Sequence, residues 1–249
     1  MIKNIKSQIR KNFNKIFWIT NPNIINIEIA VEKNFFDIFA IDYEHSLLSI
    51  DEIRTVIIYL NVKKIPIFIR FSKSNFIEAP KFLDFGIDGV IVSDVGSYKE
   101  LKIIKDVIFY PKIGKRGVGL GRMNKHGKNF QEYLNNFNNS LVFLPMIEKE
   151  INTQEIENIF KDPEVDGCLI GPYDLSMSLG KPGNFYSQRF IKIQNDILKM
   201  KKKYKKAAGL HFMDLNIKKL SLIKKKGFNF IPILTDVQFF KIGLDFLKK

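Results

Sequence analysis

The chain of 249 residues is 45% hydrophobic and carries a formal net charge of +14 at neutral pH. That length and apolar content can bury a large core, and no linker divides the chain, so we expect one domain over residues 1–249. The single cysteine, Cys168, excludes an internal disulfide and favours a reducing, cytoplasmic location. No apolar run approaches the roughly 20 residues of a membrane-spanning helix, so we expect no membrane partner.

Short runs rich in Ile, Val, Leu and Phe alternate with longer helical patterns along the chain. Most of these runs are continuous, which is typical of parallel strands covered on both faces. The predicted strands are residues 16–20, 36–42, 66–71, 89–94, 142–148, 167–172, 207–212 and 228–236. Helical patterns between them include residues 51–60, 75–85, 98–107, 154–160, 190–203 and 214–225.

About eight strand–helix units predict a closed (β/α)8 barrel of the TIM type. An open doubly wound sheet is the alternative, but it prefers a Gly-rich turn after its first strand, and Thr20-Asn21-Pro22-Asn23 is not one. In a barrel, catalytic groups lie at the carboxyl ends of the strands. Polar or charged residues follow nearly every predicted strand there, namely Asp42 with Glu44 and His45, Arg70, Ser93 with Asp94, Glu148, Asp174, His211 and Asp236.

The excess positive charge gathers in lysine clusters at residues 199–206 and 224–226. Both clusters end predicted helices just before a strand, which places them at the barrel end opposite the candidate chemistry. Cations at helix C-termini complement the helix dipole. Aromatic residues do not interleave with these lysines as a base-stacking surface would require. We therefore expect no nucleic-acid partner, and keep a catalytically inactive basic barrel as the non-enzyme alternative.

The segment 164–183, EVDGCLIGPYDLSMSLGKPG, carries the strongest signal of a site. Gly171 and Pro172 stop a strand and let a ligand approach bare backbone, and Asp174 follows at once. Glu148 ends the preceding strand, and neighbouring strands lie about 4.8 Å apart, so both carboxylates can reach one point. Two oxygen ligands with open positions suit Mg²⁺ or Mn²⁺, although helix caps and ion pairs are the commoner use of such acids.

Three further residues are candidates for catalysis. Arg70 closes an apolar strand and must find an anion, either a partner carboxylate or a ligand. His45 can exchange a proton near neutral pH, and Asp84, in the next helix, can orient Arg70. A salt-bridged arginine and a solvated loop histidine are the alternatives. His126 is expected in a loop, and the role of His211 stays open.

Several motifs together resemble the HpcH/HpaI aldolase/citrate lyase family. They are Asp42-Tyr43-Glu44-His45-Ser46, Arg116-Gly117-Val118-Gly119, Met146-Ile147-Glu148 and Gly171-Pro172-Tyr173-Asp174-Leu175-Ser176, followed by Leu179-Gly180-Lys181-Pro182-Gly183. The resemblance runs from about Asp37 to the C-terminus. It implies a metal-dependent (β/α)8 barrel, usually a homo-oligomer of six chains, that cleaves or forms a carbon–carbon bond next to a 2-oxo acid such as pyruvate, with an aldehyde as the other partner.

The resemblance also implies roles for individual residues. Glu148 and Asp174 resemble ligands of Mg²⁺ or Mn²⁺, with Co²⁺ as a further candidate. Arg70 resembles the group that holds the keto oxygen, and His45, supported by Asp84, resembles the base that acts on the aldol hydroxyl. Backbone around Gly171 and Pro172, beside Asp174, would receive the substrate carboxylate. Three positions depart from the family pattern: Met146 replaces a usual Gln, Ser93 a usual Pro, and His126 a usual Tyr.

The leading hypothesis is therefore a divalent-metal-dependent aldolase acting on a 4-hydroxy-2-oxo acid. No lysine stands at a predicted inner strand end, so we do not expect an aldolase that forms a Schiff base. A lyase acting on an acyl-CoA or citrate-like substrate is the second enzymatic hypothesis.

Overall fold

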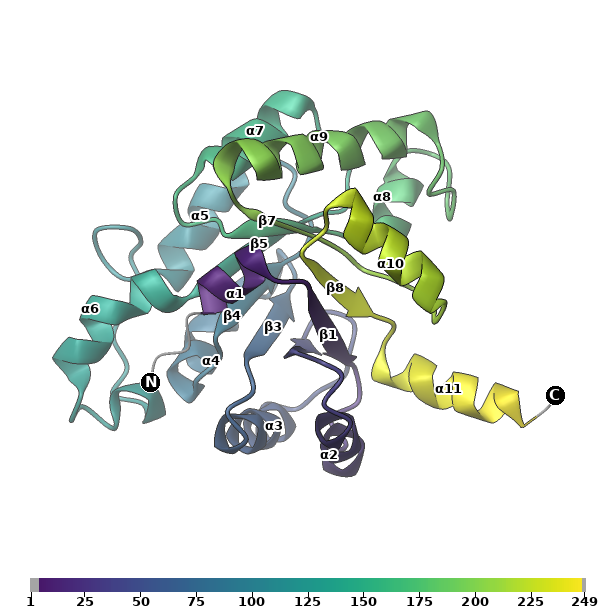
Figure 1. The fold of residues 1–249 in the computed structure, drawn as a ribbon. Helices are drawn as coiled ribbons and strands as arrows, with labels where there is room; N and C mark the ends of the chain where they lie inside the picture. The colour runs from purple at the N-terminus through teal and green to yellow at the C-terminus, as the bar shows by residue number, and fades with distance from the viewer. Residues whose placement is uncertain (1–4, 248–249) are drawn as a thin grey trace.

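The computed structural model describes residues 5–247 and contains a closed barrel of eight parallel strands (Figure 1). The strands follow one another around the barrel in sequence order, and the last pairs with the first. They are β1 (Asn14–Ile19), β2 (Ile38–Asp42), β3 (Ile67–Phe71), β4 (Gly89–Val92), β5 (Val142–Ile147), β6 (Gly167–Ile170), β7 (Ala207–Leu210) and β8 (Phe230–Ile233). The predicted (β/α)8 barrel is thus confirmed, and the open-sheet alternative is wrong.

Alternate residues of each strand face the barrel interior and the surrounding helices, because a strand has a side-chain period of two. Ile16 and Trp18 of β1 belong to the inner cluster, whereas Phe17 belongs to the outer one. Two large rings fill space that glycines leave open. A Cβ on Gly89 would lie 2.4 Å from the Phe68 ring, and one on Gly209 would lie 2.2 Å from the ring of Phe230. The interior is therefore a packed core with its open face at the strand ends.

Helices cover the outside of the barrel and begin at recognisable caps. The Ser49 side chain and Glu52 form a capping box at the start of α3, and Thr235 with Gln238 does the same for α11. The helices are α1 (Ile5–Lys11), α2 (Ile24–Glu32), α3 (Ile50–Val62), α4 (Ala79–Phe85), α5 (Tyr98–Ile108), α6 (Phe130–Ser140), α7 (Thr153–Lys161), α8 (Pro172–Ser178), α9 (Gln188–Tyr204), α10 (Ile217–Lys226) and α11 (Asp236–Phe246). Among the described residues, none of these helices is long and apolar enough to cross a membrane.

The lysine clusters lie where the sequence predicted them. Lysines end α9 and α10 immediately before β7 and β8, at the amino ends of the strands. Cys168 is fully buried in β6, and burial raises the pKa of its thiol, as expected for a core cysteine. The barrel therefore separates its cationic end from the strand ends that carry the candidate chemistry.

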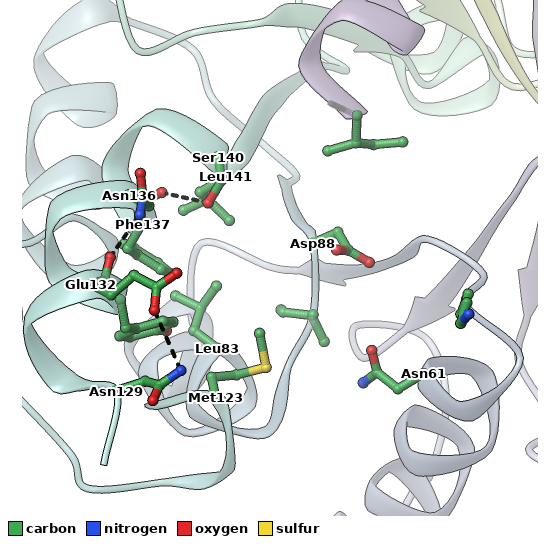
Figure 2. A pocket seen from close by; sticks show the side chains of 14 residues that line it. Asn61, Leu83, Asp88, Met123, Asn129, Glu132, Asn136, Phe137, Ser140 and Leu141 are labelled. Carbon is green, nitrogen blue, oxygen red and sulfur yellow. Dashed lines mark hydrogen bonds between the residues drawn. The ribbon is translucent and has the colours of Figure 1, made fainter. Parts of the chain in front are cut away.

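A pocket of about 370 Å³ lies away from those strand ends, among α3, α4 and α6 (Figure 2). Several of its polar side chains form hydrogen bonds within the fold. Asn61 donates to the carbonyl oxygen of Gly86 (3.0 Å), and Asn136 donates to that of Glu132 (2.8 Å). Figure 2 shows that the amide of Asn136 turns toward its own helix, α6. This pocket belongs to the packing between helices and contributes nothing to the barrel mouth.

Candidate functional site at the barrel mouth

At the barrel mouth, the last inward-facing residues of five strands form one layer. Continuing the series of inner residues by steps of two leads to Asp42 in β2, Arg70 in β3, Glu148 after β5, Gly171 after β6 and His211 after β7. Four of the five carry ionisable side chains, set above a wholly apolar layer. The alternation of the strands is thus what assembles the site.

Asp42 and Arg70 form a buried bidentate ion pair. They are direct partners in the register of β2 and β3. Arg70 Nε donates to Asp42 Oδ1 (3.0 Å) and Nη2 donates to Oδ2 (2.5 Å), with side chains only 7% and 3% exposed. Trp18 Nε1 also donates to Asp42 Oδ2 (3.1 Å). Burial alone would raise the pKa of Asp42, but the pairing with Arg70 and these hydrogen bonds hold it below its ordinary value. Asp42 therefore stays ionised and fixes the guanidinium.

The remaining nitrogen of that guanidinium faces two other carboxylates. Arg70 Nη1 lies 2.9 Å from Glu44 Oε2 and 3.9 Å from Glu148 Oε1. Ser93 Oγ donates to the other oxygen of Glu44 (2.8 Å). Arg70 thus forms the salt bridge that the sequence analysis gave as an alternative, with Asp42 as its partner. The opposite side of the same guanidinium points toward Glu148.

Glu148 is a buried carboxylate in an acidic environment. Its Oε2 accepts a hydrogen bond from the backbone N–H of Asp94 (2.9 Å). Burial raises the pKa of Glu148 to about 7; the hydrogen bond from Asp94 and the charge of Arg70 lower it in part, and the nearby carboxylates of Glu44 and Asp174 raise it. A Cβ on Gly171 would lie only 2.6 Å from Glu148 Oε1. The missing side chain at Gly171 therefore keeps the space over this carboxylate open.

Asp174 lies in a helix, beyond the strand end where the sequence placed it. β6 ends at Ile170, Gly171 is the N-cap of α8, and Pro172 occupies the first turn together with Asp174. The Asp174 side chain is exposed, yet its charge acts on the pKa of Glu148. Two hard carboxylates, one buried and one open to solvent, fit the oxygen donors of a divalent ion that keeps other positions for water or substrate. Across residues 5–247, no group of three or more His, Cys, Asp or Glu side chains suits a metal.

The side chains of His45 and Asp84 are not in contact. The His45 side chain is 65% exposed, its backbone N–H donates to Asp42 Oδ1 (3.1 Å), and its Nε2 lies 4.0 Å from Glu44 Oε2. Asp84, in α4, instead pairs with the buried Arg116 (2.6 Å). Burial raises the pKa of Asp84, partly offset by that pairing. The expectation that Asp84 orients Arg70 is therefore wrong for this chain, because Asp42 does so from inside the barrel.

His211 and Trp18 complete the inner wall and were not predicted as site residues. The two rings lie 4.8 Å apart, and His211 Nε2 lies 3.1 Å from the carbonyl oxygen of Leu234. Burial lowers the pKa of His211 to about 4. This histidine is therefore neutral at pH 7 and donates to Leu234 through Nε2. Both residues could have been predicted from the two-residue side-chain period of the strands, which turns them toward the barrel interior as it does Asp42.

The three departures from the family pattern have different surroundings. Met146 is buried in the inner cluster one layer below Glu148. Ser93 is fully buried and bonds to Glu44, as described above. His126 is exposed in a turn with a positive φ of 54°, as expected of a loop residue. Only Ser93 therefore touches the charged groups of the mouth.

Comparisons with known proteins agree with this arrangement. The model of the HpcH/HpaI aldolase/citrate lyase family matches residues 15–240. A 2-keto-3-deoxy-L-rhamnonate aldolase of Salmonella paratyphi B is 26% identical over 248 residues, covering 96% of this chain and 90% of the relative. An HpcH/HpaI aldolase from Desulfitobacterium hafniense DCB-2 superposes with a TM-score of 0.82 at 19% identity, over 100% of this chain and 98% of that one. The citrate synthase SbnG superposes with a TM-score of 0.84 at 19% identity, over 98% and 96% of the two chains.

The two structural likenesses support the barrel, and the family model covers most of the chain, including every residue of the mouth described above. The relative from Salmonella is named for cleavage of a carbon–carbon bond. The chain therefore belongs to the HpcH/HpaI aldolase/citrate lyase family and is a carbon–carbon lyase of that family.

Proposed function

We propose that the chain is a divalent-metal-dependent aldolase that cleaves or forms a 4-hydroxy-2-oxo acid, with pyruvate or a related 2-oxo acid and an aldehyde as the other reactants. The observation that carries this proposal is the fixed guanidinium of Arg70, whose Nη1 lies 3.9 Å from Glu148 Oε1. A rigid cation beside a buried carboxylate that lacks a full counter-charge suits a substrate with adjacent keto and carboxylate oxygens. Glu148 and Asp174 would hold Mg²⁺ or Mn²⁺, with Co²⁺ as a further candidate.

The side chains of the mouth would divide the chemistry as follows. A bound divalent ion supplies Lewis-acid polarisation of the keto group. Arg70 would bind the keto oxygen as negative charge develops there, and its fixed orientation requires no rearrangement during the reaction. His45 would accept the proton of the 4-hydroxyl group from the solvent side of the mouth. Backbone around Gly171 and Pro172 would receive the substrate carboxylate.

Two substitutions test the proposal. Arg70→Ala is expected to lower kcat/KM by about 10²–10³ while Mn²⁺ still binds, because the arginine acts mainly on developing charge. Asp174→Ala is expected to lose Mn²⁺ binding and turnover without unfolding, since the side chain is exposed. Asp51→Ala, an exposed aspartate in the first turn of α3, is the matched control. Wild-type turnover in either site variant would show that the site is misplaced.

Trapping and chelation distinguish this chemistry from a Schiff-base aldolase. Borohydride added with pyruvate is expected to leave the protein unmodified, and a chelator is expected to abolish turnover. Covalent trapping in a chelator-resistant enzyme would overturn the proposal. Turnover of acyl-CoA esters in place of 4-hydroxy-2-oxo acids would replace the aldolase assignment with the second enzymatic hypothesis.

The proposal includes a cytoplasmic homo-oligomer, with six chains by family resemblance. Helix α11 extends away from the barrel (Figure 1), and its Phe240 and Leu244 side chains are 67% and 49% exposed. Such apolar side chains on a projecting helix are typical of a surface covered by another copy. Light scattering on wild type is expected to give a multiple of the chain mass, and Phe240→Asp with Leu244→Asp a smaller species. A monomeric wild type would contradict the assembly while leaving the site untouched.

A further inference from the structure

An open, cationic pocket of about 490 Å³ lies at the barrel end opposite the mouth. It forms where α1 packs near the start of β7 and the end of α9 (Figure 1). Helix α1 contributes Lys6, Arg10 and Lys11, and residues 201–206 contribute four lysines, so all but one of the eight lining residues are cations. Among residues 5–247, no carboxylate lines the pocket.

The carboxylates near the pocket do not balance these cations. Asp166, which is fully buried beneath it, pairs with Arg10 (2.5 Å) and Lys6 (3.5 Å), so one negative charge serves two positive ones. The side chains of Asp162 and Glu164 are held by Lys105, at 2.7 and 2.6 Å. Most of the positive charge of the pocket is therefore without an ionic partner.

The other lysines of the pocket have neutral hydrogen-bond partners or, among residues 5–247, none. Lys206 is buried, and its Nζ donates to the carbonyl oxygen of Asp162, while Lys201 Nζ donates to that of Gly227. Within residues 5–247, the exposed Lys11 and Lys202 form no ion pair with a carboxylate. The Nε of Arg10 is buried and has no hydrogen-bond partner in the part of the chain that the structure describes. Donors are thus available at both the floor and the rim of the pocket.

The lowered pKa values of three lysines in the pocket agree with a shortage of carboxylates around them. Burial lowers the pKa of Lys206 to about 8, and nearby Asp162 restores only part of the difference. Burial also lowers the pKa of Lys6 and Lys201 below the ordinary value. Buried cations are normally paired. A pocket in which the buried Lys206 and the half-buried Lys201 have only carbonyl partners is suited to an anion that supplies the charge from outside.

We propose that the pocket between α1 and the end of α9 binds a small oligophosphate, such as inorganic triphosphate or the phosphate chain of a nucleotide. Lysine ammonium groups act as point charges that suit phosphate oxygens from many directions. One phosphate would neutralise only part of the excess, whereas a chain of three carries enough charge to match it. A nucleic-acid strand would need cations spread along a track, but these cations converge on one concavity.

Calorimetric titration with sodium triphosphate in metal-free buffer tests the proposal. The Lys11→Ala/Lys202→Ala double variant removes two exposed cations from the rim while leaving Asp166 and its partners in place. Lys99→Ala/Lys218→Ala removes the same charge from exposed positions at the starts of α5 and α10, toward the mouth. We expect saturable binding by wild type, a Kd at least about tenfold higher for the rim variant, and a change below about twofold for the control.

Three outcomes would overturn the proposal. The first is the absence of saturable triphosphate binding, and the second is an equal loss in both double variants, which would indicate diffuse attraction by the net charge. The third is tighter binding of a single-stranded oligonucleotide with a steeper salt dependence, which would indicate an extended nucleic-acid surface. Thermal unfolding of both variants verifies that the fold is retained.

Discussion

Glu148→Gln is expected to stabilise the metal-free protein at pH 8 while abolishing Mn²⁺ binding. The carboxylate is 7% exposed, and burial first, then neighbouring carboxylates, raise its pKa from 4.5 to about 7. Because the folded state binds this proton more tightly than the unfolded state, the contribution to stability is present below pH 4.5 and is lost as the pH rises through 7. Each pKa unit corresponds to about 1.4 kcal/mol, so the ionised side chain costs the metal-free fold ~3 kcal/mol at pH 8.

Urea unfolding with EDTA at pH 5 and pH 8 measures this cost. The Gln variant is expected to be more stable than wild type at pH 8, by up to ~3 kcal/mol, and to lose ~2 kcal/mol of that advantage at pH 5. Glu28→Gln, an exposed position in α2, is the control and should change stability by only a few tenths of a kcal/mol, about equally at both pH values. Mn²⁺ should then stabilise wild type but not the Glu148 variant. The electrostatic reasoning would be refuted if the Glu148 variant were less stable than wild type at pH 8, or if the stability difference between the two did not change with pH.

Three further predictions follow from the same contacts. Gly171→Ala is expected to weaken Mn²⁺ binding in a calorimetric titration by about 10–100-fold, because its Cβ would lie 2.6 Å from Glu148 Oε1, a proposed metal ligand. Gly117→Ala, with nothing within 4 Å, should bind as wild type, and equal titrations would rule out the steric argument. Asp42→Asn is expected to cost about 3 kcal/mol in urea unfolding and to slow pyruvate release in a coupled assay, because a buried guanidinium loses its ionic partner; a stable, fully active variant would contradict this. The imidazole NMR signals of His211 should not shift between pH 5.5 and 8, given a pKa of about 4, and a titration there would disprove its neutral state.

The strands could be predicted from the sequence because burial on both faces leaves continuous apolar runs. Helices that bury few apolar side chains were harder to predict from the sequence. Helix α6 buries only Phe137, so its polar sequence resembles a loop. Gly171 and Pro172 were interpreted as a strand stop that leaves backbone open to a ligand, yet proline also suits the first turn of a helix, and α8 begins there. Asp174 consequently lies in a helical turn and not at a strand end.

The site could be predicted as a set of residue types but not as a set of contacts. Arg70 was expected to need an anion, and the sequence left a partner carboxylate or a ligand as equal alternatives. The register of β2 against β3 decides this, since it sets Asp42 opposite Arg70. Asp84 was chosen because it follows Arg70 in the same strand–helix unit, but its helix directs it toward Arg116. Proximity along the chain does not show which face of a helix a side chain occupies.

Net charge is a poor guide to what this barrel binds, because its two ends carry opposite local charge. At the mouth, Asp42, Glu44 and Glu148 surround a single arginine, whereas the far pocket gathers lysines and an arginine around one buried carboxylate. Strands of four to six residues separate the ends by about 13–20 Å at 3.3 Å per residue, which exceeds the screening length of about 8 Å at physiological salt. Each end therefore acts on ligands through its own groups. A chain with a charge of +14 can accordingly attract a divalent cation at one end and a polyanion at the other.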